Sequence, residues 1–232
     1  MPTPTRAAGR GPSRLVARPP TVAPVPPDLR PGARKVDAGP GREVLLHVPS
    51  GLEEGPPARL VLVLHGAGGD ARGGLAPLLP LARAHRLLLL APASRGSTWD
   101  GVVGGWGPDV RRIDDALAAV LRSVPVAGGG LAISGFSDGA SYALSLGLAN
   151  ADLFTRIVAF SPGFVVPVRP IGTPSVWISH GRDDTVLPID RTTRRIVPQL
   201  RAAGVPVEVR EFDGPHAVPR EIAEEGARRL AA

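Results

Sequence analysis

The sequence lacks cysteine altogether, which excludes disulfide bonds, thiol catalysis and thiolate metal sites. Aromatic residues make up 4% of the 232 residues, and lysine occurs once. No apolar run is long enough to cross a membrane, and the N-terminal region lacks the apolar segment of about 7–15 residues that a secretory signal carries. For a chain that starts at Met1, these absences predict a cytoplasmic protein without stable membrane insertion.

Positive charge is concentrated near the N-terminus. Residues 1–35 hold seven basic groups, one acidic group and nine prolines, whereas the rest of the chain holds 20 basic and 20 acidic groups. The body therefore lacks the basic face that nucleic-acid binding needs, so no nucleic-acid partner is expected. A Pro/Arg-rich segment without apolar periodicity buries little surface. We expect residues 1–35 to be a disordered tail whose deletion up to residue 34 leaves stability unchanged, and residues 36–232 to form one domain.

Apolar runs alternate with helical patterns along this domain. Continuous apolar stretches such as 59–64 are typical of parallel strands covered on both faces, and Ile113 and Leu117 lie on one face of a helix. The alternation predicts an α/β fold with a doubly wound, mostly parallel sheet and helices on both faces. The expected strands are 43–49, 59–64, 87–91, 131–134, 156–160, 175–179 and 206–212, and the expected helices are 75–86, 109–123, 138–149, 189–203 and 219–230. In the first helix Pro77 and Pro80 should confine the regular part to the residues after them, and Pro198 should interrupt or kink the fourth.

A nucleophile motif follows the expected strand at 131–134. The sequence GFSDG at 135–139 is Gly-x-Ser-x-Gly around Ser137, and a helix is expected directly after it. Glycines on both sides permit a turn sharp enough to leave the serine hydroxyl accessible. A serine hydroxyl needs an imidazole base to become a good nucleophile, and the imidazole needs a carboxylate to orient it.

The later strands supply an acid and a base in the order serine, acid, histidine. Asp183 and Asp184 follow strand 175–179, and His216 follows the last expected strand. This is the chain order that hydrolases with a nucleophile elbow use. The spacing alone leaves both aspartates open as the acid.

Two backbone amides and several aromatic side chains complete the candidate site. An oxyanion hole needs two N–H donors, for which we expect the amides of Asp138, directly after the serine, and Ala67, in the Gly-rich loop 65–69. Substrate-pocket candidates are Trp99, Trp106, Phe136 and Phe164, with core packing equally open for the two tryptophans.

The remaining histidines do not indicate a metal or cofactor. His65 and His180 both follow expected strands, where histidines more often brace loops through hydrogen bonds than act in chemistry. No histidine pair has helical i, i+4 spacing beside a carboxylate, so no metal site is expected. The HGAGGD sequence at 65–70 lacks the Gly-Lys-Ser/Thr ending of a phosphate loop, so no cofactor is expected either.

Taken together, these motifs resemble the α/β-hydrolase superfamily, in its small phospholipase/carboxylesterase branch and the related polyhydroxybutyrate-depolymerase-like esterases. In that family HG-x-x-D places the acid four residues after its histidine, which implies Asp184 rather than Asp183. The resemblance implies an α/β-hydrolase fold without a cap domain, and hydrolysis of small-molecule carboxylic esters or thioesters without metal or cofactor. The matching segments are HGAGGD at 65–70, WGPDVRRIDDAL at 106–117, GFSDGA at 135–140, SHGRDDTVLP at 179–188 and GPH at 214–216.

Two other functions fit the same residues. A protein of this fold can bind a small ligand without turning it over, but the full Ser–Asp–His set favours an enzyme. A peptidase would use the same triad, although such peptidases usually carry a further domain for which this chain has no room. Residues 161–173 are too few for a helical cap, so an open site acting on soluble short-chain esters is expected.

Overall fold

The computed structural model describes residues 12–20, 30–52, 55–103, 105–124, 126–127, 130–166 and 171–232. The strands are β1 (Gly32–Lys35), β2 (Val44–Val48), β3 (Arg59–Leu64), β4 (Leu87–Pro92), β5 (Leu131–Phe136), β6 (Phe154–Phe160), β7 (Ser175–Gly181) and β8 (Val207–Phe212). The α-helices are α1 (Ala71–Leu75), α2 (Pro108–Leu121), α3 (Asp138–Ala149), α4 (Thr193–Ala202) and α5 (Arg220–Ala231). Short 3-10 helices are η1 (Leu79–Leu81), η2 (Asp100–Val102) and η3 (Ile189–Arg191).

All eight strands form one sheet in the order β1-β2-β4-β3-β5-β6-β7-β8. The strands from β4 through β8 in this order are parallel, while β2 runs antiparallel to β4 and β1 antiparallel to β2. This confirms the predicted mostly parallel, doubly wound sheet. The carboxyl ends of parallel strands meet at one edge, so the loops after β3, β5, β7 and β8 converge there.

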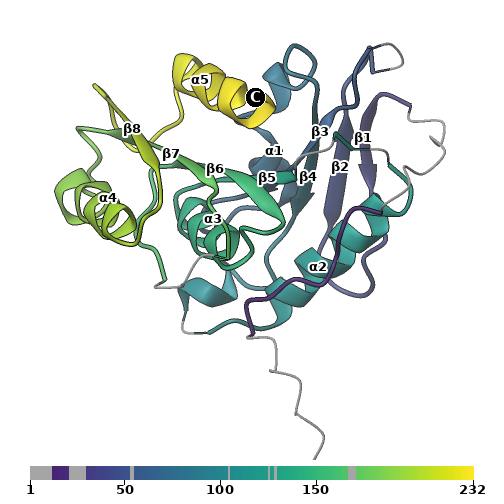
Figure 1. The fold of residues 1–232 in the computed structure, drawn as a ribbon, viewed down its shortest axis with the longest axis horizontal. Coiled ribbons are helices and arrows are strands. Elements are labelled where there is room, and N and C mark those ends of the chain that lie inside the picture. Colours follow the sequence, from purple (N-terminus) through teal and green to yellow (C-terminus); the bar gives the residue numbers. More distant parts are fainter. Residues whose placement is uncertain are drawn as a thin grey trace, which may run out of the picture.

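Helices cover both faces of the sheet (Figure 1). One apolar core joins α2, α3 and α4 to one face, and a second core joins α1 and α5 to the other. In β3, Leu60 and Leu62 point into the first core, while Val61 and Val63 point into the second. Burial on both faces is the reason that this strand is apolar at successive positions.

The predicted helix at 75–86 is wrong. Helix α1 begins earlier because Asp70 caps it, accepting a hydrogen bond from the Gly73 amide at 2.8 Å, and it ends at Leu75. Pro77 and Pro80 lie in the expected span, and a proline cannot donate the amide hydrogen that a helix interior needs. After α1 the described chain forms turns and η1 instead of a regular helix.

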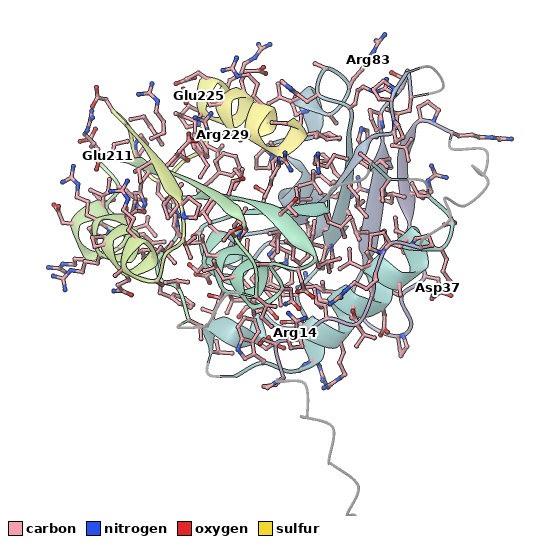
Figure 2. All side chains as sticks on the ribbon, viewed as in Figure 1. Arg14, Asp37, Arg83, Glu211, Glu225 and Arg229 are labelled. Carbon is pink, nitrogen blue, oxygen red and sulfur yellow. The ribbon has the colours of Figure 1, made fainter. Side chains whose placement is uncertain are left out.

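The N-terminal region is in part ordered, contrary to the prediction of a tail to residue 35. Residues 32–35 form β1, whose GARK sequence has no apolar alternation to reveal a strand. Residues 12–20, here called the N-terminal strap, lie along the face that carries α2 and α3 (Figures 1 and 2). Residues 1–11 and 21–29 lie outside the described residues, so the prediction is untested there.

Hydrogen bonds and one buried leucine fix the strap to the two helices. The Asn150 side chain accepts from the Leu15 amide at 2.9 Å and donates to the Ser13 carbonyl at 2.8 Å. Asp114 of α2 accepts from two further strap amides, those of Val16 and Ala17. The Leu15 side chain is fully buried in the core with α2 and α3. The strap is therefore held by buried apolar surface and by hydrogen-bonded amides, and is not disordered as the composition predicts.

An ion pair adds to this attachment. The Arg14 guanidinium binds both carboxylate oxygens of Asp152, at 2.9 and 2.8 Å. Its hydrogen bonds hold the pKa of Asp152 at about 2, below the ordinary 3.8. Because the carboxyl pKa is depressed in the folded state, this contribution to stability is present at neutral pH and is lost as the pH falls from about 4 towards 2.

Leu15→Ala should lower the melting temperature by several degrees. Truncating a fully buried leucine lowers the free energy of unfolding by about 2–5 kcal/mol where the surroundings cannot collapse. The strap can also detach locally, and the free energy of that detachment sets an upper limit on the loss. For a protein of this size each kcal/mol corresponds to about 2–4 °C. The matched control is the adjacent Val16→Ala, because that side chain is 58% exposed. Equal melting temperatures for the two variants in a calorimetric scan would show that the strap does not pack on the body.

Candidate functional site

Ser137 lies between β5 and α3, at a backbone conformation that few residues other than glycine adopt. Its φ is +57° and its ψ is −120°, and its amide donates to the Phe160 carbonyl at the end of β6 at 2.9 Å. A side chain at positive φ costs free energy, and such residues persist where the surroundings over-determine them. The sharp turn therefore places the Ser137 hydroxyl beyond the carboxyl edge of the sheet.

The flanking glycines are required by close backbone packing. A Cβ atom at Gly135 would lie 2.3 Å from the Gly139 carbonyl oxygen, and one at Gly139 would lie 2.3 Å from the Leu64 carbonyl oxygen. Both contacts are with backbone, which cannot move aside as a flexible side chain can. The Gly-x-Ser-x-Gly spacing thus lets α3 start directly against β5 and β3.

His216 lies between Ser137 and Asp184. Its Nε2 atom is 2.9 Å from the Ser137 Oγ, and its Nδ1 atom is 2.5 Å from the Asp184 Oδ2. A carboxylate accepts hydrogen bonds, so the neutral ring carries its proton on Nδ1 and leaves Nε2 free to accept from the hydroxyl. The structure therefore brings together three of the residues that the sequence singled out. A serine, imidazole and carboxylate in this order can generate a nucleophilic oxygen.

Asp184, and not its neighbour, is the carboxylate that reaches His216. Its side chain is buried, and its Oδ1 accepts from the amides of Val186 and Leu187 at 2.9 and 2.7 Å. Burial by itself would raise the pKa of Asp184, but the hydrogen bonds from Leu187 and His216 outweigh it and lower the pKa below 3.8. Asp183 is exposed.

The glycine-rich loop after β3 passes directly beside Ser137. A Cβ atom at Gly66 would lie 3.3 Å from the Ser137 Cβ, so the backbone of the loop approaches the nucleophile closely. Gly68 adopts a φ of +70° and donates to the Ser97 carbonyl, which curls the loop. Within the described part of the chain, the amides of Ala67 and Asp138 donate to no protein acceptor. Their assignment to an oxyanion hole stays a prediction.

His65 braces this loop. Its Nε2 accepts from the Ser94 amide at 2.9 Å, so the ring proton is on Nδ1, which donates to the Gly66 carbonyl at 2.7 Å. Burial lowers the pKa of His65, with a smaller opposing effect from the Gly66 carbonyl, so the ring is neutral. The indole N–H of Trp99 donates to the His65 carbonyl at 2.9 Å.

The four expected pocket aromatics have different environments. Trp99 is fully buried between His65 and Tyr142, so its assignment to a substrate pocket is wrong and core packing applies. Trp106 is half-buried, and its ring also packs against that of Tyr142, with the ring centroids 5.2 Å apart. Phe136 is half-buried, and the centroid of its ring lies 4.7 Å from that of the His216 ring, which contacts Ser137.

Phe164, the fourth candidate, lies on the connection from β6 to β7. The described part of this connection is tied to α3, because the Gly163 amide donates to the Ser141 hydroxyl and the Val166 amide donates to the Ser145 hydroxyl, both at 2.9 Å. Phe164 is half-buried there. Residues 167–170 lie outside the described residues.

Sequence reasoning missed the polar contacts that hold the loop between β4 and α2. Asp109, in the first turn of α2, is buried and accepts from the Arg95 and Asp100 amides at 2.7 and 2.9 Å. Burial raises the pKa of Asp109 although both hydrogen bonds oppose this. The Thr98 hydroxyl donates to the Asp138 carboxylate at 2.6 Å. The DGVVGGWGPD sequence carries no signal for contacts that depend on tertiary structure.

Two further properties concern the described ranges as a whole. They contain no group of three or more His, Asp or Glu side chains arranged to hold a metal ion. No helix within them has the length and apolar character needed to span a membrane.

Comparison with known proteins gives weak but consistent similarities to esterases. No protein-family model matches the sequence. The chain is 28% identical over 176 residues to feruloyl esterase C of Emericella nidulans, and 26% identical over 172 residues to a probable feruloyl esterase C of Aspergillus terreus. Each alignment covers 71% of this chain and 62% of the relative. The chain thus spans less than two thirds of the length of these curated relatives.

Solved structures share the fold. A ferulic acid esterase from Anaeromyces mucronatus, solved with ferulic acid, superposes with a TM-score of 0.64 over 94% of this chain and 97% of its own, at 17% identity. At this identity the similarity concerns the arrangement of the chain. The eight-stranded sheet and its helices are those of an α/β-hydrolase.

Proposed function

We propose that this chain, which has the α/β-hydrolase fold, is a hydrolase of carboxylic esters that uses Ser137, His216 and Asp184 as a catalytic triad. The observation that carries the proposal is the position of the His216 ring, within hydrogen-bond distance of the Ser137 hydroxyl on one side and of Asp184 on the other. Similarity to feruloyl esterases supports the same reaction class.

The reaction begins at the Ser137 hydroxyl. Its oxygen attacks the carbonyl carbon of the ester while His216 Nε2 takes the hydroxyl proton, and Asp184 stabilises the imidazolium that forms. The carbonyl oxygen becomes an oxyanion, which the amides of Ala67 and Asp138 bind. Donors fixed in advance stabilise this charge without reorganising, and an oxyanion hole is often the largest single contribution to the rate.

The second half of the reaction returns the enzyme to its resting state. His216 gives its proton to the leaving alkoxide oxygen, and the alcohol departs from an acyl-enzyme on Ser137. Water then loses a proton to His216 and attacks the acyl carbon. As the second intermediate collapses, the bond between the acyl carbon and the Ser137 oxygen breaks, His216 returns the proton to that oxygen, and the carboxylic acid is released. Neither half needs a metal or redox group to balance its atoms and electrons.

Active-site labelling tests the proposal directly. A fluorophosphonate should inactivate hydrolysis of p-nitrophenyl acetate, and mass spectrometry should locate the adduct on Ser137. Methyl ferulate and a thioester of the same acyl group, compared by kcat/KM, then separate the substrate classes. Labelling at another serine would overturn the assignment. A chain that neither reacts with the probe nor hydrolyses any of the esters would be a non-catalytic binding protein.

The site should act on soluble esters without activation at an interface. The described part of the β6–β7 connection contains no helix, and its Gly163 and Val166 amides bind the Ser141 and Ser145 hydroxyls of α3. We expect hydrolysis of p-nitrophenyl acetate and butyrate to rise hyperbolically with substrate concentration, with no jump at the solubility limit of longer esters. Activity confined to aggregated long-chain substrate would instead require a mobile cover over the site.

A further inference from the structure

Two histidine rings lie beside the same oxygen of the Asp184 carboxylate. His216 Nδ1 lies 2.5 Å from Oδ2, and His180 Nε2, at the end of β7, lies 3.1 Å from the same atom. The side chains of both His180 and Asp184 are completely buried. The second histidine has no part in the mechanism described above, although it contacts the acid directly.

The proton of His180 can be assigned from its partners. Nε2 also lies 2.8 Å from the Leu187 carbonyl oxygen, so both of its neighbours accept hydrogen bonds and neither can donate. Nε2 therefore carries the hydrogen. Nδ1 lies 2.7 Å from the Thr193 hydroxyl, which can donate to it. Burial lowers the pKa of His180, opposed in part by the Leu187 carbonyl, and the ring is neutral.

We propose that His180 is a positioning residue for the triad, whose Nε2–H shares the charge of the Asp184 Oδ2 atom and thereby sets the pH at which His216 becomes a base. The inference rests on the proposed function, because it concerns the same acid and base. Its physical origin is competition: a carboxylate oxygen that accepts two N–H donors holds less charge for either of them than an oxygen that accepts one.

Both oxygens of the carboxylate have two N–H groups beside them. Oδ1 accepts two backbone amides, while Oδ2 accepts from His216 and lies 3.1 Å from His180 Nε2. The single hydrogen on His180 Nε2, which also bonds the Leu187 carbonyl at 2.8 Å, is therefore shared between that carbonyl and Oδ2. Without the His180 donor, the charge on Oδ2 would act on His216 alone and would stabilise its protonated form.

Other charged groups on the surrounding elements are engaged elsewhere. On the side of the nucleophile, the Asp138 carboxylate accepts from Thr98. On the outer side, near β8 and α4, acidic and basic groups pair with one another, and Asp183 faces solvent (Figure 2 labels Glu211). These outer groups are Arg182, Asp183, Asp190, Arg194, Glu211 and Asp213.

Two variants of His180, which differ from each other by one methylene group, distinguish the roles of its two ring nitrogens. In His180→Gln the amide nitrogen can occupy the place of Nε2 and keep a donor towards Asp184. In His180→Asn the shorter side chain reaches only the place of Nδ1, beside Thr193, and the donor is lost. We expect the acid limb of the kcat/KM profile of His180→Asn to move to higher pH by about half a unit or more, and that of His180→Gln to stay closer to the wild type.

Thr193→Val is the control for general damage to this part of the core. It removes the hydroxyl beside Nδ1 but leaves both acceptors of Nε2, so the acid limb should stay within about 0.2 units of the wild type even if the melting temperature falls. A role in stability alone would lower the melting temperatures of the three variants without moving the acid limb, and that result would overturn the inference.

A measurement on the wild-type protein needs neither activity nor a variant. Nitrogen-15 NMR of labelled histidines distinguishes protonated from bare ring nitrogens, and His180 should carry its proton on Nε2 from pH 5 to 8. A proton on Nδ1 would overturn the inference. If the protein hydrolyses no ester, the proposed function fails by itself, and the NMR titration of the His216 ring in the Asn and Gln variants still decides whether His180 tunes it.

Discussion

Ser137→Ala should reduce kcat/KM for p-nitrophenyl acetate by about 10⁴-fold or more while leaving the protein folded. The substitution removes the oxygen that would bond to the acyl carbon and that would give its proton to His216 Nε2. The Cβ atom stays, so packing against Gly66 is unchanged. The lost hydrogen bond to His216, 2.9 Å long, is part-buried and contributes little to stability.

The control and the readout are chosen to separate chemistry from folding. Ser123→Ala removes an exposed hydroxyl near the end of α2 and should keep full activity. Circular dichroism and the melting temperature should be close to wild type for both variants. Retained hydrolysis in Ser137→Ala, with the protein folded and free of contaminating esterase, would place the nucleophile elsewhere.

Asp184→Asn should slow kcat/KM by at least about a hundredfold. The Oδ1 position must accept the amides of Val186 and Leu187, so the new NH2 group takes the place of Oδ2. There it faces the Nδ1–H of His216, and two donors cannot share a hydrogen bond. His216 would have to change tautomer, which puts a hydrogen on Nε2 and prevents it from accepting the Ser137 proton.

Asp183→Asn is the matched control, one residue away. Its side chain is exposed, and its backbone amide donates to the Gly214 carbonyl at 3.0 Å whichever side chain is present. We expect a loss below about tenfold, because only a solvent-screened charge changes. The comparison requires kcat/KM for both proteins after their folding has been verified. An inactive Asp183→Asn beside an active Asp184→Asn would reverse the assignment.

The sheet and the nucleophile motif could be predicted because their signals are local. The strand at 59–64 has the same bounds in the structure, since apolar burial on both faces leaves a continuous run. The turn at Ser137 is visible because Gly135 and Gly139 meet neighbouring backbone, which only glycine permits. The role of His216 could be predicted from chain order, because the loops that follow parallel strands all lie at the same edge of the sheet.

The features that the sequence did not predict have a common physical cause. Each depends on contacts between residues that are far apart in the sequence. Leu15 looks isolated in a Pro/Arg-rich segment, and its burial depends on Asn150 at the far end of α3. Trp99 could equally line a pocket or a core until Tyr142 is placed against it. The second contact to the acid, from His180, needs the turn that brings Leu187 back over β7. Composition and spacing carry none of this information.

The order of the strands makes the residues of the proposed triad unequal in local stability. Ser137 follows β5 in the middle of the sheet, whereas His216 follows β8, which pairs with β7 alone in the described sheet. Opening at a sheet edge costs less free energy than opening at its centre. Brief detachment of β8 therefore carries the base away from a nucleophile that is still in place. Heat or urea should consequently abolish turnover before the far-UV signal changes, and activity should return when the edge closes again.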